Sequence, residues 1–145
     1  MSSVHRIALA LVAACAATIT APQALSAQGA NAAPKIEFSE VPSYDCGGPD
    51  KTETFAGRVT GIAPSQVRLV IYAQACNGML YVQPREDRRI IRPTDQGGFD
   101  IQSHLGHVYY VLVTKPTYAA QNQLTDVPEK GGDIIAVFSV SGKKK

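Results

Sequence analysis

The stretch 66–84 constrains the fold most, because it has the pattern of two strands joined by a tight turn. Residues 67–75 place apolar side chains at every second position, as in a strand with one face in a core. Asn77-Gly78 is the preferred pair for a two-residue type I′ turn, since both residues tolerate positive φ. Pro84 ends the second arm because proline cannot donate to a ladder. We therefore predict a β-hairpin at the centre of the fold.

The rest of the chain predicts further short strands, separated by turns rich in Gly and Pro. The stretch 107–115 is apolar almost throughout, which is typical of a central strand covered on both faces. No segment shows sustained helical periodicity. Seven or eight strands at this spacing predict an all-β, Ig-like antiparallel β-sandwich, with a small closed barrel as the alternative. Outside the hairpin, the predicted strands are 35–41, 53–62, 99–104, 107–115 and 133–141.

The first 27 residues have the three-part layout of a secretory signal peptide: a basic start, an apolar run over 7–21 and small residues before 28. This predicts an exported protein, periplasmic or secreted, with a linker at 28–34, one domain at 35–141 and a frayed basic tail at 142–145. Alternatively, Cys15 follows Val-Ala-Ala as in a bacterial lipobox, which predicts lipidation at Cys15 and a membrane-anchored lipoprotein.

Two cysteines remain in the mature chain, Cys46 in a Gly-rich loop and Cys76 at the predicted hairpin tip. In an exported chain this favours one disulfide, which would join the loop to the hairpin. The alternative, a metal or redox pair, lacks the close CxxC spacing.

The order of short motifs along 35–140 resembles a family of secreted β-sandwich modules, which are appended to bacterial glycoside hydrolases and to extracytoplasmic sensor proteins. The resemblance implies an Ig-like fold and association with a glycan or an envelope protein. Members usually carry a Trp pair where this chain has Leu80 and Tyr81, so the sugar-stacking surface is reduced here. The matching residues are Ile36, Phe38, Val41-Pro42, Gly48-Pro49-Asp50, 57–61, Tyr72-Ala73, Val82-Gln83-Pro84, 103–106 and Tyr109.

The outward face of the central hairpin is the predicted ligand-binding surface, since strand parity groups polar and aromatic side chains there. The alternative is that the long polar connection 116–132 covers this face. The residues of the predicted surface are Arg68, Tyr72, Gln74, Tyr81 and Gln83.

Three other groups could carry chemistry. Four arginines in one loop could contact an anionic polymer, although such charge runs are usually solvated. His104 and His107 lack a third metal ligand, so we expect His104 to bond a turn carbonyl at the end of its strand and His107 to be solvated. Tyr109 is expected to be a tyrosine corner, a packing device. The arginines are Arg85, Arg88, Arg89 and Arg92.

The residue pattern shows no catalytic constellation. It has no GxSxG elbow, no phosphate-binding loop before a helix and no evident carboxylate pair. A formal net charge of +2 gives no strong field for nucleic acid. We therefore expect a non-catalytic exported binding module without a cofactor or metal. The alternative is a structural or assembly subunit that contributes a sheet edge to an envelope complex.

Overall fold

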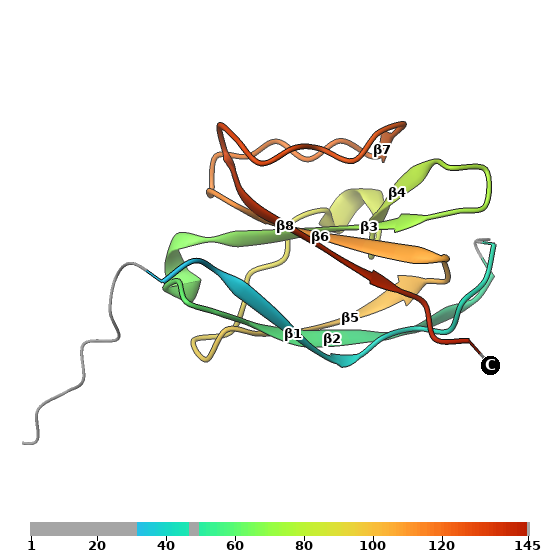
Figure 1. Cartoon of the computed structure of the whole chain (residues 1–145), viewed down its shortest axis with the longest axis horizontal. Coiled ribbons are helices and arrows are strands. Elements are labelled where there is room, and N and C mark those ends of the chain that lie inside the picture. Colours follow the sequence, from blue (N-terminus) through green and yellow to red (C-terminus); the bar gives the residue numbers. More distant parts are fainter. Residues whose placement is uncertain (1–31, 47–49, 145) are drawn as a thin grey trace, which may run out of the picture.

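The computed structural model describes residues 32–46 and 50–144, which form two packed antiparallel sheets (Figure 1). The sheet orders are β1-β2-β5 and β7-β4-β3-β6-β8. This confirms the predicted Ig-like sandwich. The elements are β1 (Lys35–Glu40), β2 (Thr52–Thr60), η1 (Pro64–Gln66), β3 (Arg68–Gln74), β4 (Leu80–Gln83), η2 (Glu86–Arg88), β5 (Gly98–His104), β6 (Val108–Thr114), β7 (Gln123–Leu124) and β8 (Ile134–Ser141).

Aromatic rings fill the core between the two sheets. Phe55 is buried at its centre, with its ring centroid 5.6 Å from that of Phe38, 5.8 Å from Phe99 and 5.1 Å from Tyr109. The Tyr109 hydroxyl accepts a hydrogen bond from the N–H of Gly106 at 2.8 Å, which confirms the predicted tyrosine corner. This cluster occupies the core of a chain that has no Trp.

Residues 115–133 form a third layer, here called the strap. The strap crosses the five-stranded sheet on the side away from the three-stranded sheet, and β7 within it pairs with β4 (Figure 1). A second apolar cluster lies beneath the strap, where Ala120, Tyr118 and Leu124 pack against residues of β3, β4 and β6. Strand β6 is therefore covered on both faces, as its composition predicts.

The tip of the β3–β4 hairpin differs from the predicted type I′ turn. Gly78 has a φ of +85°, but no described non-glycine residue has positive φ, so Asn77 is not in the required conformation. The N–H of Gly78 bonds to the carbonyl of Ala75 at 3.0 Å, and the N–H of Ala75 bonds to the carbonyl of Met79 at 3.0 Å. The turn therefore has three residues, with a bulge at Gly78.

This extra residue shifts the pairing of the hairpin by one position. Gln83 pairs with Ile71 and Tyr81 pairs with Ala73, whereas a two-residue turn would place Gln83 opposite Tyr72. A shift of one residue moves every side chain of a strand to the other face of the sheet. Tyr81 and Gln83 therefore lie on the opposite face from Tyr72.

Residues 142–144 of the predicted frayed tail 142–145 follow β8 along the surface of the fold, and two of them bond to it. Gly142 is buried, and its N–H bonds to the carbonyl of His107 at 3.0 Å. Lys143 donates its N–H to Pro42 at 2.9 Å and accepts from the N–H of Tyr44 at 2.7 Å. The chain after β8 thus crosses to the segment that follows β1 and ties the two sheets together.

The predicted disulfide joins Cys46 to Cys76, with an S–S distance of 2.10 Å. The N–H of Cys76 also bonds to the carbonyl of Cys46 at 3.1 Å. A disulfide of this kind fits an oxidising compartment. The predicted signal peptide and the alternative lipidation site Cys15 lie outside the described residues. Within 32–46 and 50–144, no helix has the length and apolar character needed to cross a membrane.

Candidate functional site: the edge strand β8

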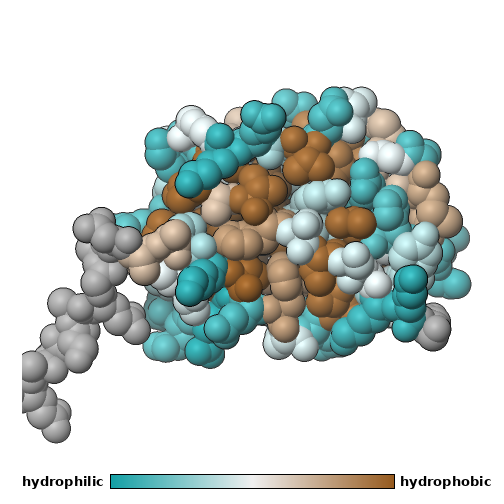
Figure 2. All heavy atoms as spheres, in the orientation of Figure 1, coloured by the Kyte–Doolittle hydropathy of each residue, from teal (hydrophilic) through white to brown (hydrophobic). Residues whose placement is uncertain are grey.

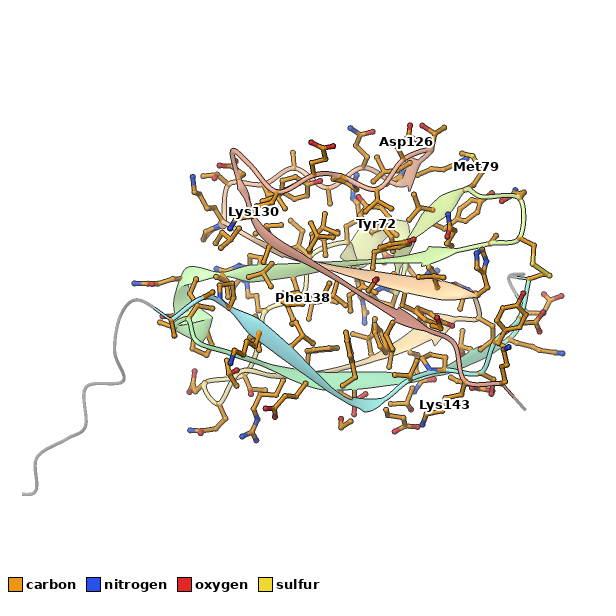
Figure 3. The ribbon with its side chains drawn as sticks, in the orientation of Figure 1. Tyr72, Met79, Asp126, Lys130, Phe138 and Lys143 are labelled. Atoms are coloured by element: carbon orange, nitrogen blue, oxygen red, sulfur yellow. A yellow bond between two sulfur atoms is a disulfide. The ribbon has the colours of Figure 1, made fainter. Side chains whose placement is uncertain are left out.

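The structure does not bring the five residues of the predicted hairpin surface together. Tyr72 is 0% exposed beneath the strap, and its hydroxyl donates to the carbonyl of Gln121 at 2.9 Å. Figure 3 shows Tyr72 between the five-stranded sheet and the strap. Burial, and secondarily the neighbouring Tyr118, raises the pKa of Tyr72 to about 12. The strap therefore covers this face, which is the alternative that the sequence left open.

The polar residues beside Tyr72 are engaged within the fold. Arg68 donates from Nη1 to the carbonyl of Val67 at 2.6 Å, and Gln74 donates from Nε2 to the carbonyl of Gly78 at 3.0 Å. These bonds hold the ends of β3.

Gln83 connects the two sheets instead of facing solvent. It is 1% exposed, and its Oε1 accepts from the N–H of His104 at 2.8 Å. His104 does end β5 as predicted, but the partner of its ring Nδ1 is Oε1 of Gln83, at 3.2 Å, and not a turn carbonyl. Of the predicted surface, only Tyr81 is a substantially exposed aromatic residue, at 40%.

The arginine loop is exposed but does not form a concentrated cationic site. Arg89 donates to the carbonyl of Ala120 at 2.9 Å, which fastens the loop to the strap. Arg85 lies 3.7 Å from the carboxylate of Asp87. Arg88 and Arg92 are exposed. One of the four cations is thus structural and one is paired with an acid.

The two histidines serve separate parts of the structure. His107 has its ring centroid 6.1 Å from that of Tyr44, and its buried Nδ1 has no hydrogen-bond partner among the described residues. The expectation that His107 is solvated is therefore wrong for this nitrogen. No group of three or more His, Cys, Asp or Glu residues within 32–46 and 50–144 could hold a metal ion.

The sheet edges remain as places where another molecule could bind, and three of the four are protected. Strand β1 carries Lys35, Glu37 and Glu40 and has an irregular register near its end. Strand β5 carries Asp100, and its last N–H is bonded by Gln83. Strand β7 has two residues. Charges, irregularities and shortness are the usual devices that prevent strands from pairing between molecules.

Strand β8 has few of these protections. Its eight residues, IIAVFSVS, include no charged residue, no Pro and no Gly. Its only irregularity is a register shift at its start, opposite Val113/Thr114. Strand β8 is the last strand in its sheet, with β6 on one side and no strand of the described chain on the other.

The pairing with β6 determines which backbone groups of β8 face outward. The bond from Gly142 N–H to His107 O makes that pair a hydrogen-bonded one, and in an antiparallel ladder such pairs alternate. The backbone N–H and C=O groups that face β6 therefore belong to Val140, Phe138 and Ala136. The N–H and C=O groups that face outward belong to Val137, Ser139 and Ser141.

Apolar side chains accompany this edge. Several residues of β8 and β1 are only partly buried although they pack against the core between the sheets. Figure 2 shows apolar side chains gathered on the face over which β8 and β1 pass in Figure 1. The edge thus combines unpaired backbone groups with partly exposed apolar area. The residues are Ile36, Phe38, Ile135, Ala136, Phe138 and Val140.

The sequence predicts a strand at 133–141 but not that it is an unprotected edge. The lack of charge in this strand is the signal that could have indicated it. Comparison with known proteins adds no assignment, since no family model, no curated protein and no solved structure matches the chain.

Proposed function

We propose that this protein is a non-catalytic exported module that binds another polypeptide strand along the outer edge of β8, as a structural or assembly subunit. The observation that carries the proposal is the outward row of backbone groups at Val137, Ser139 and Ser141 on a strand without charge or proline. Addition of a strand to such an edge is a common mode of peptide recognition, with affinity from main-chain hydrogen bonds.

Further observations support the exported location, and a separate one disfavours a glycan-binding surface on the hairpin. The disulfide fits an exported protein, and the motif order resembles secreted accessory modules. The hairpin surface on which sugar stacking would depend keeps one exposed aromatic residue, Tyr81. A single ring offers less stacking area than the Trp pair usual in the resembling modules.

Site-specific photo-crosslinking in the native host tests the proposal. A photoreactive phenylalanine analogue replaces Ser141, whose side chain is exposed and whose backbone groups face outward. The matched control carries the same group at Gln102, which is exposed on the β5 edge. We expect a discrete polypeptide adduct from position 141 and none from position 102. Equal adducts from both positions, or none from position 141, would overturn the proposal.

A blocking variant links the adduct to strand pairing. Ser139→Pro removes one outward N–H and spares the bonds to β6, because the N–H of Ser139 faces away from β6. Ser139→Lys is a second blocking variant that keeps the N–H and places a charge on the edge. Both should reduce the adduct from position 141. An adduct that persists undiminished in both variants is not made through the β8 edge.

A further inference from the structure

We infer that the strand that pairs with β8 is β8 of a second copy of this chain, running antiparallel across a two-fold axis. This inference rests on the proposed function and names its partner. The five-stranded sheet would then continue through the edge into the same sheet of the other subunit. Such an isologous interface uses the same surface on both copies.

The positions of the outward groups fit this symmetry. An antiparallel pairing centred on Ser139 places it opposite Ser139 of the partner subunit. It also places Val137 opposite Ser141 of the partner subunit. The two-fold axis then places Ser141 opposite Val137 of the partner subunit. Each of these pairs exchanges two backbone hydrogen bonds. All three residues whose groups face outward are thereby satisfied on both strands.

The side chains of β8 are compatible with facing themselves. In this register Phe138 lies beside Val140 of the partner subunit, on the side of the sheet that faces the core. Both residues are only partly buried in one copy, so pairing removes more of their apolar surface from water. No charged side chain lies between Ile134 and Ser141, so no like charges are brought opposite each other along the strand.

The charges at the ends of β8 favour the antiparallel direction. Asp133 precedes the strand, and Lys143 and Lys144 follow it. A parallel arrangement would set the lysines of the two copies side by side, whereas the antiparallel one separates them by the length of the strand. At the other end of the strand, Asp133 lies 3.7 Å from Lys115 of its own chain, so the separation of the lysines is what favours this direction. Figure 3 shows Lys143 beyond the end of β8 that lies away from the strap.

The protected edges argue for β8 as the only self-pairing strand in the described chain. Strand β1 would place Glu37 and Lys35 at its interface, and β5 would place Asp100 at its own. Strand β7 is too short to hold a partner. Pairing through β8 alone closes a dimer and leaves no further edge for growth.

Crosslinking with isotopically mixed protein tests the inference. The protein is purified as its host exports it, as unlabelled and nitrogen-15-labelled samples that both carry the photoreactive group at position 141. These are mixed, irradiated and analysed by peptide mass. We expect crosslinked peptides that combine labelled and unlabelled chains and map to residues 134–144 on both. The same group at position 102 should give no such product.

Light scattering over a dilution series measures the dimer itself. Ser139→Pro and Ser139→Lys should raise the dimer Kd by about tenfold or more, because at least one hydrogen bond at the symmetry axis is lost or a like-charge pair is created there. Gln102→Pro and Gln102→Lys, the matched changes on the β5 edge, should leave it unchanged. Unfolding curves show whether each variant is folded. If Ser139→Pro does not fold, Ser139→Lys alone decides the test.

The outcomes separate this inference from the proposed function. A dimer that is lost in the Ser139 variants, with mixed-label crosslinks, supports both. A monomer that crosslinks from position 141 to a different protein in the host overturns self-pairing and leaves the proposed function standing. A dimer that does not respond to either Ser139 variant also overturns self-pairing. The absence of any adduct at position 141, in the host and in the purified protein, overturns both.

Discussion

The side-chain oxygen of Gln83 in β4 accepts a hydrogen bond from the backbone N–H of His104 in β5 at 2.8 Å, and so joins the two sheets. The Nε2 group of Gln83 donates to the carbonyl of Tyr81 at 3.1 Å, so both ends of the amide are used. Because β5 is an edge strand, the N–H of His104 has no ladder partner on that side. Gln83 supplies the missing acceptor from the opposite sheet.

Replacement of Gln83 by Leu should therefore lower stability. Leu preserves much of the buried volume but leaves the N–H of His104 without its acceptor, which costs about 1–3 kcal/mol. Urea denaturation would measure the change in the free energy of unfolding. Gln102→Leu, at an exposed position two residues before His104, should change it by no more than about 0.5 kcal/mol. If the two substitutions changed the free energy of unfolding equally, the hydrogen bond between Gln83 and His104 would contribute nothing to stability.

Loss of the disulfide should lower the free energy of unfolding more than loss of the Gln83 side-chain amide does. The bond closes a sequence separation of 30 residues, for which the chain-entropy description gives about 3–4 kcal/mol. We expect the double variant Cys46→Ser, Cys76→Ser to unfold at a correspondingly lower urea concentration. Reductant should destabilise the parent protein to the same extent and leave the double variant unchanged. A parent protein whose unfolding is indifferent to reductant would contradict this expectation.

The strands, the disulfide and the tyrosine corner could be predicted because each depends on short-range pattern or on a small number of candidates. Alternation of apolar residues reports a strand wherever one face is buried. With two cysteines outside the predicted signal peptide, there is one pairing to consider. Tyr109 lies close in sequence to Gly106 and His104, which its hydroxyl contacts.

The candidate surface could not be predicted, because burial of Tyr72 depends on residues far away in the sequence. Its hydroxyl contacts Gln121, 49 positions later, and no local pattern of β3 indicates that cover. The local pattern of β6 predicts a central strand, but the local pattern of β8 does not show that its outer side is an open edge. That β8 is the last strand of its sheet is decided by strand order, which is a long-range property of the fold.

The register of the hairpin depends on one residue, which makes it testable by paired substitutions. Gly78→Ala places a β-carbon where φ is +85°, so we expect a loss of about 1 kcal/mol or more, although the added atom meets nothing within 4 Å. Asn77→Ala removes the bond from Asn77 Oδ1 to the N–H of Met79, at 3.0 Å, and should cost less. Urea denaturation would compare the free energies of unfolding of the two variants. A type I′ turn would instead make both positions sensitive, because it requires positive φ at each.

Two buried tyrosines should make the protein sensitive to alkali. Burial raises the pKa of Tyr72 and of Tyr109 from 10.0 to about 12, and for Tyr109 the nearby Glu53 and Asp45 also contribute. Below pH 10 both hydroxyls are neutral in the folded and unfolded chains, so their contribution to stability is fully present. As pH rises from 10 toward 12, the unfolded chain ionises first, and the free energy of unfolding falls by up to about 2–3 kcal/mol per tyrosine.

Urea denaturation at pH 8, 10 and 11 would measure this alkaline loss. Tyr72→Phe should lower stability at pH 8 by about 1 kcal/mol, because the bond to Gln121 is lost. It should also make the fall above pH 10 shallower, because phenylalanine does not ionise. The gap between parent and variant should therefore narrow as pH rises. A gap that stays constant from pH 8 to pH 11 would mean that Tyr72 ionises as readily in the folded chain as in the unfolded one, and the strap would then not exclude water from its hydroxyl.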